Sequence, residues 1–63
     1  MDVGKWVKVK DEDDYFLIKS IDQDRGYVEL SDITGHTWYC AMRDVERTLT
    51  NEELYIKDKS ERN

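Results

Sequence analysis

The chain of 63 residues carries 15 acidic and ten basic side chains, a formal net charge of −5 at pH 7. A chain of this length supplies one small domain, in which only about 60% of the unfolded surface becomes buried. The acidic charge opposes non-specific binding to nucleic acid and favours a cationic or polar partner. No segment approaches the ~20 consecutive apolar residues that span a bilayer, so we expect no membrane association.

Cysteine usage and metal-ligand spacing exclude further classes. The single cysteine, Cys40, cannot form a disulfide within the chain, and no paired Cys and His spacing indicates structural zinc. A chain of this kind is typical of a reducing compartment, so we expect a cytoplasmic protein without a cofactor. Residues 22–26 resemble the opening of an EF-hand loop, but the distal glutamate is missing at the required spacing, so calcium is not expected.

The first three expected elements are strands, because apolar and polar residues alternate or nearly alternate over residues 6–10, 15–22 and 27–30. The period of two places one set of side chains on an inner face. These are Val7, Val9, Phe16, Ile18, Val28 and Leu30. Ile21 joins this face only if the second strand contains a β-bulge near residues 19–20, so we predict one there.

The loops between these strands also follow from composition. Four consecutive acids at residues 11–14 predict a solvated loop. Residues 23–26 predict a hairpin, because Gly26 can adopt a positive φ without steric cost.

A fourth strand is expected over residues 36–42, after an Asp/Gly turn at residues 32–35. We place Trp38, Cys40 and Met42 on its buried face, because they include the thiol and the larger apolar volume. Residues 43–47 predict a single 3-10 turn in which Val45 plugs the end of the fold, and residues 48–49 predict a short closing strand.

The C-terminal residues carry a helix-start signal. Thr50 and Glu53 match the capping box, and Leu49 and Leu54 occupy the positions of a hydrophobic staple. We therefore expect a short helix from about Asn51, with fraying over residues 57–63. The chain divides into a β-domain over residues 1–50 and a short C-terminal helix with a frayed tail over residues 51–63.

The order of these elements resembles the SH3-like barrels, including their Tudor and KOW-type members. Residues 4–9, 15–30 and 38–45 carry the likeness, which covers residues 3–50. The resemblance implies an all-β fold: a small five-stranded antiparallel barrel of meander type, with a 3-10 turn and a short C-terminal helix or tail. The Ala-Leu-Tyr-Asp-Tyr start, the Trp-Trp pair and the proline of peptide-binding SH3 domains are missing, so a PxxP ligand is not expected.

Aromatic residues on the outer face are the best candidate site. The strand pattern points Trp6, Tyr15, Tyr27 and Tyr39 outward, and exposed aromatic rings are common anchors of protein interfaces. The acidic loop, together with Asp22 and Asp24, would receive a basic partner segment. That loop consists of Asp11, Glu12, Asp13 and Asp14. The alternative is that the rings shield the barrel or pair across strands, and that the loop is only solvated.

The leading hypothesis is thus a non-enzymatic adaptor or regulatory module that binds another protein, present as a monomer or a weak homodimer formed through an open sheet edge. His36 and Cys40 share a strand face, but no oxyanion donor or third orienting group accompanies them. Two alternatives remain open. One is a small acidic, phage-like inhibitor that mimics DNA, and the other is a Tudor/KOW-like nucleic-acid binder that uses Trp6 with Lys8, Lys10 and Lys19.

Overall fold

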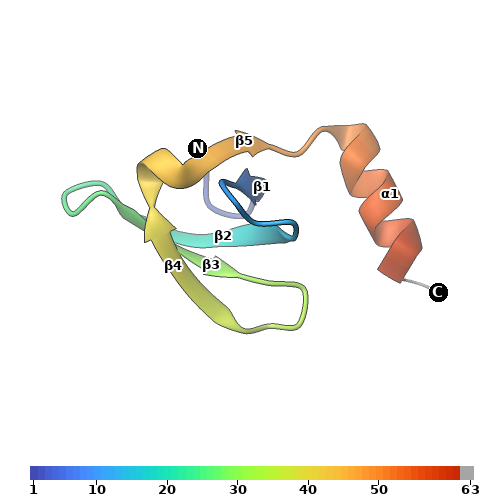
Figure 1. The fold of residues 1–63 in the computed structure, drawn as a ribbon, viewed down its shortest axis with the longest axis horizontal. Helices are drawn as coiled ribbons and strands as arrows, with labels where there is room; N and C mark the ends of the chain where they lie inside the picture. Colours follow the sequence, from blue (N-terminus) through green and yellow to red (C-terminus); the bar gives the residue numbers. More distant parts are fainter. Residues whose placement is uncertain (62–63) are drawn as a thin grey trace.

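The structure, a computed structural model, describes residues 1–61, with side chains described for residues 1–56. It contains a single antiparallel sheet of five strands, one 3-10 helix and one α-helix (Figure 1). In chain order these are β1 (Trp6–Val9), β2 (Tyr15–Asp22), β3 (Tyr27–Ser31), β4 (Thr37–Ala41), η1 (Met42–Asp44), β5 (Val45–Thr48) and α1 (Asn51–Glu61).

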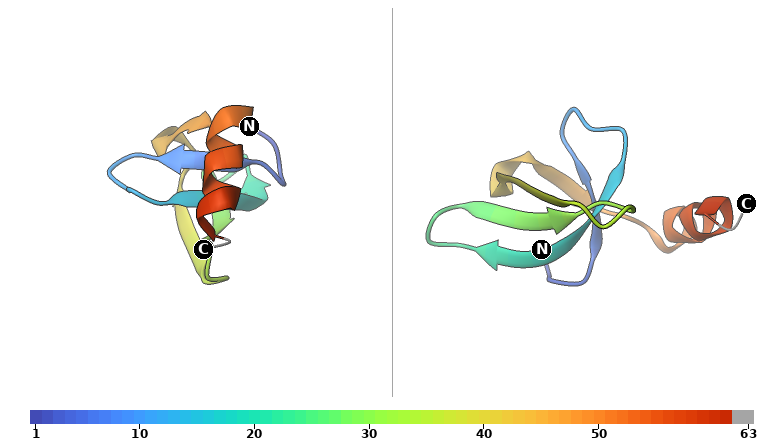
Figure 2. Two further views of the ribbon diagram at one scale, coloured as in Figure 1. Left: turned by 90° about the vertical axis from the view of Figure 1, so that its right-hand side faces the viewer. Right: turned by 90° about the horizontal axis from the view of Figure 1, so that it is seen from below.

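The strand order is β4-β3-β2-β1-β5, so each of the first four strands pairs with its sequence neighbour and β5 returns beside β1. The two edge strands are joined directly by η1, whose three residues rise only about 6 Å. The sheet must therefore curl until its edges approach each other, as the two views in Figure 2 show.

The all-β antiparallel fold is confirmed, but the expected closure into a barrel is not found. No ladder joins β4 to β5 within residues 1–61, and the sheet is open between them. The chain passes from one edge strand to the other through the 3-10 turn, and among the described residues β5 pairs with β1 on one side while its other side stays open.

The predicted inner face is confirmed and forms the core. Its six residues are at most 5% exposed, and Leu49 is also buried, outside this cluster. The predicted β-bulge in β2 is also confirmed, because the register between β2 and β3 shifts between Ile18 and Ser20. This extra residue places Ile21 opposite Val28 and against the core.

The segment after β3 differs from the sequence prediction in several bounds. The fourth strand begins at Thr37, the 3-10 helix precedes Val45, and Val45 pairs with Val9 as the first residue of β5. Val45 is therefore part of a strand rather than the plug of a 3-10 turn, because a register shift at Lys8 and Val9 lets the ladder reach it.

Trp38 corrects a second prediction. Its side chain is 49% exposed, although Cys40 and Met42 on the same face do pack against the core. An edge strand has a neighbour on one side only, so its largest side chain is covered on one side only. The indole packs edge-to-face on Phe16, with ring centroids 6.1 Å apart, and donates a hydrogen bond from Nε1 to Asp32 at 2.8 Å.

The capping box of α1 is confirmed. The Glu53 N–H donates to Thr50 Oγ1 at 3.1 Å, and the Thr50 N–H donates to Glu53 Oε1 at 2.9 Å. Arg47 of β5 donates to both carboxylate oxygens of Glu53, at 2.6 and 2.8 Å. The helix nevertheless stands to one side of the sheet (Figures 1 and 2), with Tyr55 and Ile56 exposed. The helix extends to Glu61, and the rest of the segment expected to fray, residues 62–63, lies outside the described residues.

Candidate functional site

The outer face of the sheet brings two of the predicted aromatic residues together. Tyr27 on β3 lies diagonally across the ladder from Tyr39 on β4, because Glu29 is the direct partner of Tyr39 and Ala41 is the direct partner of Tyr27. Diagonal neighbours on one sheet face are within reach of aromatic side chains. The two rings meet edge-to-face, with centroids 6.0 Å apart and planes at 67°.

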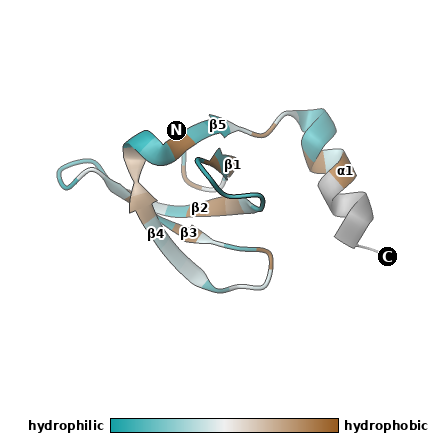
Figure 3. Ribbon diagram, in the orientation of Figure 1, coloured by the Kyte–Doolittle hydropathy of each residue, from teal (hydrophilic) through white to brown (hydrophobic). Residues whose placement is uncertain are grey.

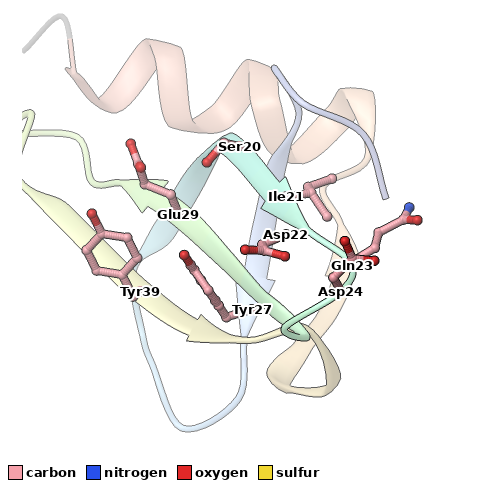
Figure 4. A pocket seen from close by; sticks show the side chains of 8 residues that line it. All are labelled: Ser20, Ile21, Asp22, Gln23, Asp24, Tyr27, Glu29 and Tyr39. Atoms are coloured by element: carbon pink, nitrogen blue, oxygen red, sulfur yellow. The ribbon is translucent and has the colours of Figure 1, made fainter.

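These tyrosines lie in a polar hollow that extends from β4 across β3 to the end of β2 (Figure 4). Its volume is about 570 Å³, large enough for one or two side chains of a partner. Its charge comes from Asp22 on β2, Asp24 in the hairpin loop and Glu29 on β3. The lining residues are Ser20, Ile21, Asp22, Gln23, Asp24, Tyr27, Glu29 and Tyr39.

The strand register explains why these acids surround the rings. Asp22 is the direct cross-strand partner of Tyr27, and Glu29 is the direct partner of Tyr39. The bulge in β2 is essential to this arrangement: without the extra residue, Asp22 would fall on the inner face together with Phe16 and Ile18. The same irregularity that buries Ile21 therefore turns Asp22 towards the hollow.

The hollow is negatively charged and only partly neutralised. Asp22 accepts a hydrogen bond from the Arg25 N–H at 3.0 Å and lies 3.8 Å from the Arg25 Nε. Within the side chains described, no hydrogen bond or ion pair engages the carboxylates of Asp24 or Glu29. Carboxylates beside the negative faces of aromatic rings attract cations, so the hollow suits an ammonium or guanidinium group.

The other predicted site residues lie elsewhere. Trp6 and Tyr15 are half-buried on the outer face of β1 and β2, where the register pairs Trp6 with Leu17 and Tyr15 with Lys8. Neither of them lines the hollow. The alternative offered by the sequence, that some rings cover the sheet rather than a partner, fits these two positions.

The acidic loop also lies outside the hollow. Asp11, Glu12, Asp13 and Asp14 are exposed and connect β1 to the start of β2, whereas the hollow lies at the end of β2. The Lys8 ammonium donates a hydrogen bond to the Glu12 carbonyl oxygen and folds over this loop. The four acids therefore stay solvated at the opposite end of the strand from the tyrosine pair.

Sequence reasoning overlooked Glu29 and Gln23 as members of the site. The signal for Glu29 was present, because the period of two puts it on the same face as Tyr27. No local signal indicates Gln23, whose place depends on the path of the hairpin.

A second polar cluster fixes the loop between β3 and β4. Asp32 Oδ1 accepts hydrogen bonds from the Thr34 N–H, the Thr34 hydroxyl and the His36 N–H, at 2.9, 2.6 and 2.9 Å. The bond from Trp38 falls on Oδ2. These bonds, led by that from the Thr34 hydroxyl, hold the pKa of the Asp32 carboxyl well below its usual range. The cluster thus fixes the exposed indole near the start of β4.

The pair His36 and Cys40 does not form a nucleophile and base in this structure. The His36 Nδ1 lies 2.8 Å from the Thr34 hydroxyl, within the loop cluster. Cys40 packs against the core, and burial raises the pKa of its thiol, with a further contribution from Asp44. A raised pKa lowers the thiolate fraction and with it the reactivity of the sulfur.

Among the described residues, no group of three or more His, Cys, Asp or Glu side chains is arranged to hold a metal ion. Within residues 1–61, α1 is too short and too polar to cross a bilayer as a helix. The sequence matches no protein-family model, and no curated protein or solved structure is significantly similar to it.

Proposed function

We propose that this protein is a non-enzymatic interaction module that holds a basic segment of a partner protein against Tyr27 and Tyr39. The observation that carries the proposal is the tyrosine pair within a hollow where two carboxylates, those of Asp24 and Glu29, have no cationic partner among the described side chains. Net charge supports the same class of partner, because the whole chain carries −5.

The energetics suit a transient complex. A cation above an exposed aromatic ring contributes about 0.5–1 kcal/mol, and an exposed ion pair adds roughly 0–1 kcal/mol. Two such cationic side chains together contribute about 1–4 kcal/mol, which by itself corresponds to a dissociation constant of about 1 mM or weaker. We therefore expect an adaptor or regulatory contact that forms and dissociates rapidly, with an affinity that falls as salt increases.

The experiment that tests this function is a titration of the ¹⁵N-labelled protein with a lysine-rich peptide, followed by NMR chemical shifts. We expect the largest shifts at Tyr27, Glu29 and Tyr39. Tyr39→Ala should weaken binding several-fold, whereas Tyr55→Ala should not, because Tyr55 is equally exposed but lies on α1 outside the hollow.

A charge-matched pair of variants separates the hollow from overall charge. Asp24→Asn with Glu29→Gln removes two negative charges from the hollow, and Asp13→Asn with Asp14→Asn removes two from the acidic loop. We expect the first double variant to weaken peptide binding and the second to leave it nearly unchanged at 150 mM salt, where charges more than about 8 Å apart are largely screened. Equal weakening by both would assign the binding to net charge and contradict the proposed site.

A further inference from the structure

The backbone of β4 is open along one side. In an antiparallel ladder, residues alternate between pairs that exchange two hydrogen bonds and pairs that exchange none. The Met42 N–H donates to the Gly26 carbonyl and the Asp32 N–H donates to the His36 carbonyl, at 2.9 and 3.0 Å. By this alternation, the backbone N–H and C=O groups of Trp38 and Cys40 point towards β3. The backbone N–H and C=O groups of Thr37 and Tyr39 therefore point away from the sheet. No backbone partner satisfies them within residues 1–61.

The two edges of the sheet are protected to different degrees. In natural proteins, charges, proline, bulges or short length commonly keep an edge strand from pairing with another chain. β5 has four residues, includes Glu46 and Arg47, and meets β1 with a register shift. β4 has five residues, without charge or proline, in the sequence TWYCA. Figure 3 shows a similar contrast, with β5 hydrophilic over its middle and β4 close to neutral, turning hydrophobic towards its arrowhead.

The side chains of β4 offer different surfaces on the two faces of the sheet. Tyr39 lies beside the acidic hollow on the outer face. Trp38, half exposed and held by Asp32 and Phe16, lies on the inner face. A strand laid along β4 would place alternate side chains beside these two surfaces.

We infer that an extended basic segment of a partner protein adds to the sheet as a sixth strand along β4. Its cationic side chains face the tyrosine hollow, and the apolar side chains between them face Trp38. This inference rests on the proposed function and specifies its binding mode: backbone hydrogen bonds to Thr37 and Tyr39 supply affinity, and the alternation of charge supplies specificity.

Charge decides between a partner segment and a second copy of this chain. Two copies that paired β4 with β4 about a two-fold axis would place their outer faces on the same side of one continuous sheet. The two acidic hollows would then be neighbours across the junction, each with Asp22, Asp24 and Glu29. Like charges oppose that arrangement, whereas a lysine-rich strand neutralises the hollow.

Four seven-residue peptides test the mode on the unmodified protein. The first alternates, Thr-Lys-Val-Lys-Val-Lys-Thr, and the second has the same composition in the order Thr-Lys-Lys-Val-Val-Lys-Thr. We expect the alternating peptide to bind about tenfold more tightly. The third and fourth are the alternating peptide with its backbone N–H groups methylated at the lysines and at the valines, respectively. Methylation at the lysines should abolish antiparallel addition, and methylation at the valines should abolish parallel addition.

A variant of the protein provides an independent test of strand addition. Thr37→Pro removes an N–H that points away from the sheet, at the first residue of an edge strand, where proline is tolerated. It should weaken binding of the alternating peptide, whereas the control Thr37→Val, which keeps the N–H, should not.

The possible results separate the two proposals. Equal affinity for both peptide orders, with no effect of either methylation, would overturn strand addition and leave the tyrosine hollow as the site. Failure of every lysine peptide to bind would overturn both. A stable dimer in sedimentation that dissociates on Thr37→Pro would show that a second copy occupies the edge, and would overturn the choice of a basic partner.

Discussion

Replacing Ile18 by alanine tests whether the stability of this domain depends on the inner face of the sheet. Ile18 is 1% exposed and belongs to the core of six residues. The substitution removes three buried carbon atoms, and at about 0.8 kcal/mol for each the lost transfer free energy is about 2.4 kcal/mol. The cavity adds to this loss, within the range of roughly 2–5 kcal/mol seen for such changes.

This loss is large for so small a domain. At about 0.05–0.15 kcal/mol per residue, a chain of this length has a free energy of unfolding of roughly 3–9 kcal/mol. Each kcal/mol shifts the melting temperature of such a domain by about 4–8 °C, so the transfer contribution alone should lower Tm by about 10–20 °C. Thermal unfolding followed by circular dichroism measures the shift, and urea titration provides the free energy.

Leu17→Ala is the matched control. It removes the same number of carbon atoms from the adjacent residue of the same strand, but Leu17 lies on the outer face and is only half-buried. We expect it to cost less than half as much as Ile18→Ala. If Leu17→Ala proved equally or more destabilising, the assignment of inner and outer faces would be refuted, and with it the outward position of the tyrosines.

Three further outcomes are expected. Thr50→Ala should remove the cap of α1, at a cost of about 1 kcal/mol to the helix, and lower the helical circular dichroism while hardly changing the melting of the sheet; Thr50→Ser should restore the signal. The hydrogen bonds from Arg47 lower the pKa of Glu53 to about 2. Because the pKa is depressed, the stabilisation of the start of α1 by Glu53 is present above pH 4.5 and lost as the pH falls towards 2. Glu53→Gln should remove that transition from an NMR pH titration of α1. Asp32→Asn leaves one acceptor oxygen for four donors, so the Trp38 indole proton should exchange faster with water, whereas in the control Asp24→Asn it should not.

Much of the fold was predictable because it depends on local patterns. The period of two over residues 6–10 and 15–22 identified the buried faces, and the position of Ile21 out of this period identified the bulge. The capping box at Thr50 and Glu53 identified the helix start. Each of these signals lies within a few residues of the structure that it predicts.

The end of the sheet was harder to predict because it depends on pairing between distant residues. Val45 became part of β5 through a ladder with Val9, which no pattern near residue 45 indicates. Trp38 was expected inside, but an edge strand covers it on one side only. The open junction between β4 and β5 is likewise a property of the whole sheet.

The candidate site shows the same division. The sequence indicated outward tyrosines and nearby acids, but the acidic loop it emphasised lies at the far end of β2 from the tyrosine pair. Strand register places Asp22 and Glu29 beside Tyr27 and Tyr39. Glu29 follows the period of its own strand, whereas Asp24 and Gln23 come from the path of a hairpin.

The amino-acid sequence by itself determined which side chains leave water, because burial of aliphatic groups at every second residue is a short-range, repetitive requirement of a pleated strand. Only the tertiary structure decided which outward side chains become neighbours and which strand remains without a partner. Those outcomes depend on register and on strand order, which join residues far apart in the chain, so they arise only when the sheet is assembled as a whole.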